Sequence, residues 1–125
     1  MNSRTWTTYK SERMTGQVSL PEEGSNESKS LLLLLHGVGS NENALLKEGE
    51  TLLPHGKSIS LRAPIQLGRI AFAWFHVKFS KNGNTHNWTE AQRSLALLTE
   101  EIKSLSASEN IPFDRIFVAG FSQGA

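Results

Sequence analysis

Cysteine is absent from this 125-residue sequence, which excludes disulfide bridges and metal sites built on thiolates. Net charge is nearly absent too, because thirteen Lys and Arg residues are balanced by twelve Asp and Glu residues. No cluster of Lys or Arg marks a surface for a polyanion, and we therefore expect no nucleic-acid partner. The lack of cysteine also fits a reducing compartment.

The sequence also lacks a long apolar segment. Its first ten residues are polar and contain no apolar stretch of the kind found in signal peptides. The leucine run at residues 31–35 is far too short to cross a bilayer. We therefore predict a cytoplasmic protein without stable insertion into membranes, and we interpret the glycosylation sequons at Asn26 and Asn87 as coincidental.

Metal-binding patterns are missing as well. The four histidines, at positions 36, 55, 76 and 86, form no H-E-x-x-H or comparable ligand set, so we predict neither a metal nor another cofactor. His36 ends a predicted strand and is expected to support the following loop by hydrogen bonding. The other three histidines lie in predicted loops and are expected to face solvent.

The most informative motif that is present lies at residues 120–124, where Gly-Phe-Ser-Gln-Gly fits the pattern G-x-S-x-G. In this pattern a strand ends, the chain turns sharply and a helix begins, which holds the serine in a strained backbone geometry at the apex. The flanking glycines leave room for the close crossing of strand and helix. An apolar run at residues 115–119 directly precedes the motif and predicts the buried strand. The alternative, a Gly/Ser turn on the surface, is disfavoured because a buried strand would then precede the motif only by chance.

Strands and helices alternate along the later part of the chain. Strands are predicted at residues 5–9 and 16–20 as an antiparallel pair, and then at residues 31–35, 58–62 and 115–119. Leucine favours helix, but the five leucines at 31–35 are few and follow a polar loop at residues 21–30, which favours a buried strand. Strands separated by helices predict one α/β domain with a mostly parallel sheet covered on both faces.

Two helices and one long loop complete the expected elements. Asn43 is a plausible N-cap for a helix that Gly49 weakens and Pro54 ends. Residues 65–86 are long and irregular, with a turn at residues 81–84. Thr89 and Gln92 match a capping box for the clearest helix. The apolar face of this helix recurs at intervals of four and three residues and comprises Ala91, Leu95, Leu98, Ile102 and Leu105.

Four segments together resemble the phospholipase/carboxylesterase family of α/β-hydrolases, which includes bacterial carboxylesterases and acyl-protein thioesterases. The segments are LLLLHGVGS at 32–40 followed by Asn-Glu-Asn, LRAP at 61–64, AWF at 73–75 and GFSQGA at 120–125. They occur in the family's order, and the resemblance covers roughly residues 30–125. It implies an α/β-hydrolase fold that is truncated after the turn bearing the serine, with residues 1–125 forming a partial domain.

The resemblance also implies a role for each site residue. Ser122 would attack an ester or thioester carbonyl and form an acyl-enzyme. The backbone N–H groups of Val38 and Gln123 would stabilise the oxyanion. Trp74 and Phe75 would line or cover an acyl groove, although such an aromatic pair also occurs as plain core. The implied partner is a small-molecule ester or acyl substrate, and a homodimer of the full-length protein stays open.

The base that a nucleophilic serine needs is not evident in the sequence. In α/β-hydrolases an Asp or Glu and then a His follow the serine, whereas three residues follow Ser122 here. The single aspartate, Asp114, precedes the last predicted strand, about 16 Å from Ser122 at about 3.3 Å per residue. We therefore expect the N-terminal part of a longer enzyme, inactive and poorly soluble when made alone because one sheet edge is bare.

Alternatives to an active esterase remain at this stage. The chain could be a catalytically inactive hydrolase-like product or a binding module, which a genuine stop codon after residue 125 would support. Dienelactone-type hydrolysis is disfavoured because it would need a cysteine nucleophile. The sequence does not distinguish carboxylesters, lysophospholipids and acyl-proteins as substrates.

Overall fold

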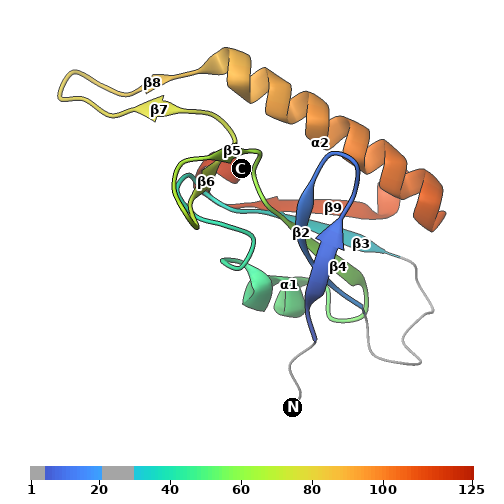
Figure 1. Ribbon diagram of the computed structural model, residues 1–125. Coiled ribbons are helices and arrows are strands. Elements are labelled where there is room, and N and C mark those ends of the chain that lie inside the picture. The colour runs from blue at the N-terminus through green and yellow to red at the C-terminus, as the bar shows by residue number, and fades with distance from the viewer. Residues whose placement is uncertain (1–4, 21–29) are drawn as a thin grey trace.

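A computed structural model describes residues 5–20 and 30–125 of the chain (Figure 1). The predicted loop at residues 21–30 lies outside the described residues, apart from Ser30. The centre of the fold is a five-stranded sheet with the spatial order β1-β2-β4-β3-β9. These strands are β1 (Thr7–Lys10), β2 (Thr15–Ser19), β3 (Leu31–Leu35), β4 (Lys57–Leu61) and β9 (Ile116–Gly120).

The strands β4, β3 and β9 run parallel, as the alternation of strands and helices predicts. β3 pairs with β4 on one side and β9 on the other, so that Leu33 lies between Ile59 and Val118. All five leucines of β3 are buried. A strand flanked on both sides and covered on both faces can be apolar throughout, which explains why this leucine run forms a strand despite its helix propensity.

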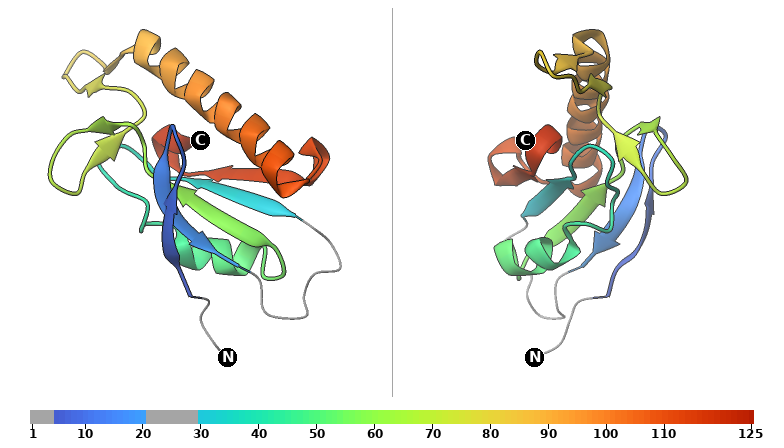
Figure 2. Two further views of the ribbon diagram at one scale, coloured as in Figure 1. Left: turned by 45° about the vertical axis from the view of Figure 1, so that its right-hand side comes forward. Right: turned by 90° about the vertical axis from the view of Figure 1, so that its left-hand side faces the viewer.

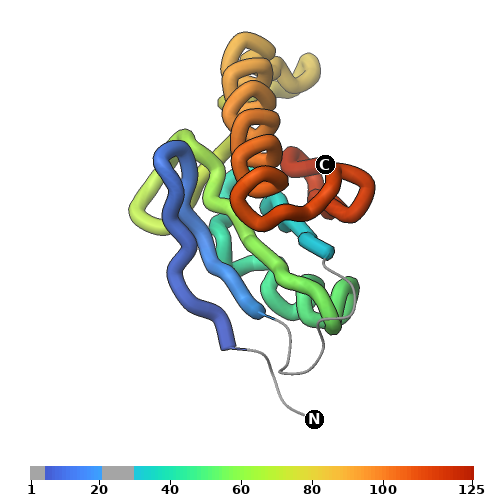
Figure 3. The backbone as a smooth tube through the Cα atoms, turned by 90° about the vertical axis from the view of Figure 1, so that its right-hand side faces the viewer, coloured from blue at the N-terminus to red at the C-terminus, as the bar shows by residue number. Residues whose placement is uncertain are grey.

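The N-terminal hairpin forms the antiparallel side of the sheet. β1 pairs with β2, and β2 pairs in turn with β4, placing Gly16 beside Leu61. A Cβ atom at Gly16 would lie 1.9 Å from the backbone oxygen of Ser60, so only glycine fits at this position. The predicted antiparallel pairing of the first two strands is confirmed. Figure 3 shows this hairpin at one edge of the sheet and the C-terminal turn at the other.

The helices cover opposite faces of the sheet (Figure 2). α1 (Leu46–Leu52) approaches the sheet through Gly49, where a Cβ atom would lie 2.6 Å from Leu34. α2 (Trp88–Glu109) covers the other face, where Leu105 joins the core formed by Leu31 and Leu33. Because alternate residues of a strand point to opposite faces, successive leucines of β3 serve the two helices in turn.

Both predicted helix caps are wrong. The N-cap position of α1 is Leu45, which makes no side-chain capping bond, while the backbone N–H of Asn43 donates to Asn41 Oδ1 at 2.9 Å. α2 begins at Trp88, one residue before Thr89. Its N-cap is therefore Asn87, whose Oδ1 accepts from the backbone N–H of Glu90 at 3.1 Å. At α2, the two common N-cap residues Asn87 and Thr89 lie two positions apart, and the capping-box pattern favoured the later one.

The predicted apolar face of α2 is only partly covered. Leu105 is buried, and Leu98 and Ile102 pack against the core as half-buried side chains. Leu95 is 63% exposed although it lies on the same face. Among the described residues, no helix combines the length and the apolar character needed to cross a membrane.

The segment at residues 65–86, predicted to be irregular, contains two short antiparallel strand pairs. β5 (Ile65–Gln66) pairs with β6 (Phe72–Ala73), and β7 (Val77–Lys78) pairs with β8 (Thr85–His86). The second pair projects beyond the N-terminal end of α2 (Figure 1). A turn at residues 81–82 lies between β7 and β8, followed by Gly83 with a φ of 114°. Strands of two residues are too short to produce a visible period in sequence.

Candidate active site

The turn after β9 has the strained geometry that G-x-S-x-G predicts. β9 ends at Gly120, and a short 3-10 turn, η2 (Ser122–Gly124), follows after one residue. Ser122 adopts a φ of 56°, which is rare for a residue other than glycine. The backbone N–H of Phe121 donates to the carbonyl of Leu35 at 3.0 Å, which ties the turn to the end of β3. Surrounding structure of this kind is what allows strained backbone to persist.

Glycines make the close packing of this turn feasible. A Cβ atom on Gly120 would lie 2.3 Å from the Gly124 carbonyl oxygen, and one on Gly124 would lie 2.2 Å from that of Leu35. A Cβ atom on Gly37 would lie 3.3 Å from the Ser122 side chain. The expectation that glycines permit a tight crossing around Ser122 is therefore confirmed, and Gly37 belongs to the same packing.

The loop after β3 lies beside this turn because β3 and β9 are parallel and in register, with Leu35 opposite Gly120. Val38, Ser122 and Gln123 consequently border one cavity of about 440 Å³. Within the described residues, the backbone N–H groups of Val38 and Gln123 donate to no protein acceptor. The structure thus brings together the three residues to which the resemblance assigned the nucleophile and the oxyanion donors.

His36 anchors the base of this loop. Its ring is 1% exposed, and its Nε2 accepts from the backbone N–H of Ala63 at 3.0 Å. Nδ1 must therefore carry the proton, which it donates to the carbonyl oxygen of Gly37 at 2.7 Å. Burial lowers the pKa of His36, so the ring is held neutral in this arrangement. These bonds agree with the expectation that His36 supports the loop by hydrogen bonding.

An ion pair braces the far side of the same loop. Glu42 is 6% exposed and accepts two hydrogen bonds from Arg62, at 3.0 Å from Nε and 2.5 Å from Nη2. Burial on its own would raise the pKa of Glu42, but the hydrogen bonds and charge of Arg62 lower it overall. The Arg62 guanidinium also lies over the ring of Phe72, 4.4 Å from its centroid. The sequence motifs did not predict the pairing of Glu42 with Arg62.

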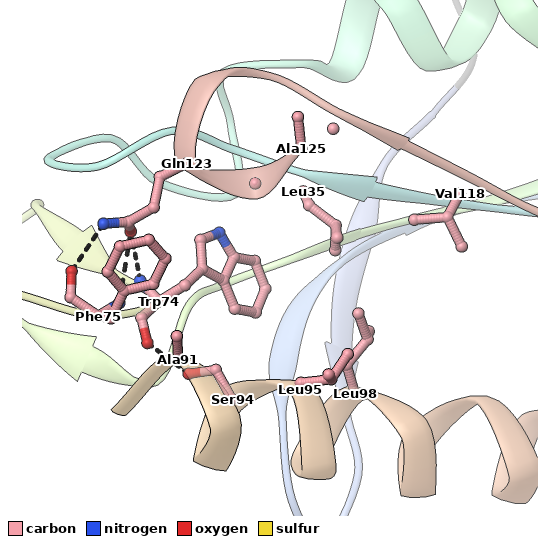
Figure 4. A pocket seen from close by; sticks show the side chains of 12 residues that line it. Leu35, Trp74, Phe75, Ala91, Ser94, Leu95, Leu98, Val118, Gln123 and Ala125 are labelled. Carbon is pink, nitrogen blue, oxygen red and sulfur yellow. Dashed lines mark hydrogen bonds between the residues drawn. The ribbon is translucent and has the colours of Figure 1, made fainter. Parts of the chain in front are cut away.

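The two aromatic groove candidates have different surroundings. Trp74 is 5% exposed, belongs to the core, and donates from Nε1 to the carbonyl oxygen of His36 at 2.8 Å. Phe75 is half-buried and lines both the cavity at Ser122 and a second cavity of about 470 Å³. The second cavity lies between α2, β9 and the C-terminal turn, and Trp74 also borders it (Figure 4).

The strand pair β7–β8 supplies the outer wall of the cavity at Ser122. The apolar and aromatic lining of this cavity comprises Val38, Phe75, Val77, Phe79, His86 and Trp88, and Asn84, which lies between the two strands, also borders it. His86 stacks on Trp88 with the ring centroids 5.0 Å apart, and Phe75 lies 5.8 Å from Trp88. The expectation that His86 faces solvent is therefore wrong, since it is half-buried in this aromatic cluster. The aromatic residues at positions 75, 79 and 88, close to His86 in the sequence, could have indicated this cluster.

The remaining histidines and Asp114 lie away from this cavity. His55 is exposed, and His76 is exposed but pairs through Nδ1 with Glu90 Oε1 at 2.9 Å. Asp114 is an exposed residue of the 3-10 turn η1 (Phe113–Arg115), at the opposite end of β9 from Ser122. Within residues 5–20 and 30–125, the Ser122 hydroxyl makes no hydrogen bond, and no group of three or more acidic or histidine side chains could hold a metal.

Known structures share this fold. The carboxylesterase from Mesorhizobium loti superposes with a TM-score of 0.75 at 18% identity, covering 95% of this chain and 54% of its own. Esterase PE8 gives a TM-score of 0.70 at 25% identity over 90% of this chain, and YahD with malic acid gives 0.66 at 18% identity over 96%. The chain therefore has the fold of the α/β-hydrolases, with a mostly parallel central sheet.

The profile of the phospholipase/carboxylesterase family matches residues 19–125. The chain belongs to that family, as the four sequence segments indicated. No curated protein matches the chain significantly. The chain spans about half the length of the structures it matches, namely 54%, 53% and 54% of those three proteins.

Proposed function

We propose that this chain carries the nucleophile of a serine hydrolase that cleaves carboxylic esters or thioesters through an acyl-enzyme on Ser122. One observation carries the proposal. Ser122 is held at a φ of 56° at the border of a cavity. Val38 and Gln123 border the same cavity, and within the described residues each has a backbone N–H group without a protein acceptor. A hydroxyl that shares a cavity with two such donors supports the arrangement that acyl transfer requires.

The reaction follows from these groups. The Ser122 oxygen forms a bond to the carbonyl carbon, and the N–H groups of Val38 and Gln123 stabilise the oxyanion that develops. The bond to the alcohol or thiol then breaks, and this leaving group takes the proton given up by the hydroxyl. Water repeats the sequence on the acyl-enzyme and releases the acid. Losing one oxyanion donor typically lowers the rate by about two to three orders of magnitude.

The proton transfers need a general base, and we place it outside the described residues. In α/β-hydrolases an acidic residue and then a histidine follow the serine along the chain. Asp114 precedes β9 and lies at its far end, so it does not fit this role. The matched structures are nearly twice as long as this chain, which leaves room for both residues in a longer protein.

The cavity at Ser122 fits an uncharged acyl or alcohol group. Its described lining contains aromatic and aliphatic side chains together with Asn84 and Gln123, and no Asp, Glu, Lys or Arg. Two of the similar structures are described as a carboxylesterase and an esterase, and the family description names phospholipase and carboxylesterase. Simple carboxylic esters are accordingly the first substrates to assay.

A second candidate is a hydrolase-like chain without catalytic activity. One observation favours it: among the described residues, no general base contacts the Ser122 hydroxyl. A stop codon directly after codon 125 would support this candidate. An open frame that supplies an Asp or Glu and then a His would support the active esterase.

A fluorophosphonate probe tests the proposed function. We expect the protein from the complete reading frame to be labelled, and we expect Ser122→Ala to abolish the labelling because the activated nucleophile is gone. Ser104→Ala is the matched control, since Ser104 is an exposed residue on α2. Labelling is read by gel fluorescence. An unlabelled but folded wild-type protein, or a labelled Ser122→Ala variant, would refute Ser122 as the nucleophile.

A further inference from the structure

The side chain of Gln123 makes contacts that its expected backbone role does not explain. Its Oε1 accepts from the backbone N–H of Trp74 at 2.7 Å and from that of Phe75 at 3.4 Å. Its Nε2 donates to the carbonyl oxygen of Phe75 at 2.6 Å. Figure 4 shows the carboxamide directed at this short stretch of backbone. One side chain thereby satisfies the backbone donors of Trp74 and Phe75 and the carbonyl of Phe75.

The segment that Gln123 holds, Trp74 and Phe75, contacts several other parts of the site. Trp74 donates from its indole to the carbonyl of His36, at the base of the loop that carries Val38. The carbonyl of Trp74 accepts from Ser94 of α2 at 2.5 Å. Phe75, next in the chain, forms part of the wall of the cavity at Ser122. The Gln123 carboxamide therefore connects the turn bearing the nucleophile to the cavity wall.

The bonds of the Gln123 side chain can stabilise the strained backbone at Ser122. The turn η2 has only three residues, and its first residue is held in a left-handed backbone conformation. Such a conformation persists only where neighbouring contacts over-determine it. The backbone bond from Phe121 to Leu35 holds one side of the turn, and the Gln123 side chain holds the other.

We propose that the Gln123 carboxamide is a positioning group that sets the spacing between Ser122 and the wall of the substrate cavity. This role is separate from that of the Gln123 backbone N–H, and it rests on the proposed function. An amide is suited to the task because its oxygen accepts and its nitrogen donates in one plane. An ionised carboxylate of the same shape would keep the bond to Trp74 but place a second oxygen against the carbonyl of Phe75.

The experiment compares Gln123→Glu, Gln123→Ala and the control Gln92→Glu in the complete reading frame. Gln92 is exposed on α2 and lies away from the cavity. With p-nitrophenyl butyrate at pH 8, we expect kcat/KM to fall about tenfold in both Gln123 variants and to stay unchanged in Gln92→Glu. For Gln123→Glu, the ratio to wild type should recover as the pH falls toward 5, because the carbonyl oxygen of Phe75 raises the pKa of the introduced carboxyl, and the protonated carboxyl donates to Phe75 as the amide does.

Hydrogen exchange provides a readout that does not depend on activity. The amide of Trp74 donates to Gln123, so the peptide containing residues 74–75 should exchange faster in Gln123→Ala than in wild type. Peptides of β1 and β2 should be unaffected if the variant remains folded.

Three outcomes separate the two proposals. Inactive, unlabelled wild-type protein would overturn the proposed function, while faster exchange at residues 74–75 in Gln123→Ala would still support the connection. An active wild type with unchanged kinetics in both Gln123 variants would overturn the positioning role alone. A Gln123→Glu ratio that stays constant between pH 5 and 8 would also contradict it, since the loss of the bond to the Phe75 carbonyl depends on the charge of the introduced acid.

Discussion

At the scale of single residues, the site depends on backbone atoms that approach one another closely. The turn at Ser122 passes so near the end of β3 that positions 120 and 124 have no space for a side chain. G-x-S-x-G therefore encodes a packing requirement as well as the proposed nucleophile. This part of the site was predictable because the glycines and the serine lie within five consecutive residues.

Gly124→Ala tests this packing. The new methyl group would lie 2.2 Å from the Leu35 carbonyl oxygen, so we expect a loss of about 2 kcal/mol or more in the free energy of unfolding. Gly68→Ala is the control, because its nearest neighbour would be the Ala71 methyl group at 3.7 Å. Urea unfolding of both variants in the complete reading frame measures the difference. Equal stability of the two variants would show that the close crossing is wrong.

The side-chain contacts of the site were not predictable from sequence. Gln123 bonds to backbone 48 and 49 residues away, and Glu42 bonds to Arg62 across 20 residues. Neither pair forms a short motif, so only the fold reveals them. The role proposed for the Gln123 backbone followed from the family resemblance and its position after Ser122, whereas the contacts of its side chain were not foreseen.

At the scale of elements, the predictions succeeded where a segment is long or strongly apolar. The leucine strand was recognised from its continuous apolar run, and the long helix from apolar residues that recur at intervals of four and three. The strand pairs at residues 65–86 were missed because each strand has two residues. The start of α2 was misplaced because Asn87 and Thr89, both favoured N-cap residues, lie two positions apart, and α1 begins without a side-chain cap.

The start of α2 offers a direct comparison of two capping hypotheses. We expect Asn87→Ala to lower the free energy of unfolding by about 1 kcal/mol, because its side chain accepts from the backbone N–H of Glu90. Thr89→Ala should change stability by less than about 0.5 kcal/mol, since Thr89 is exposed within the first turn. Thermal or urea unfolding distinguishes them. A larger loss in Thr89→Ala would restore the capping box that the sequence pattern suggested.

At the scale of the whole molecule, the described sheet ends at β9 with an apolar surface. Phe117 and Val118 are 48% and 49% exposed, and Phe121 is 66% exposed. Exposed apolar edge strands favour association. The expectation that the 125-residue chain is poorly soluble when made alone is consistent with these exposures and stays a prediction.

The overall topology could be predicted because the family's four segments lie at strand ends. Because β3, β4 and β9 are parallel, their carboxyl ends lie on the same side of the sheet, and the loops that follow them meet there. Parallel pairing thus carries residues some 80 positions apart, such as Val38 and Ser122, to one cavity. Sequence spacing alone would not reveal this proximity without the assumption of a parallel sheet.

Trapping the acyl-enzyme tests the central claim most directly. The protein from the complete reading frame is mixed with p-nitrophenyl butyrate, quenched with acid within seconds, digested and analysed by mass spectrometry. We predict a butyryl group on Ser122, in the peptide that follows Arg115, and no such group in Ser122→Ala. A butyryl group on another residue, or steady hydrolysis by Ser122→Ala at the wild-type rate, would contradict the assignment of Ser122 as the nucleophile.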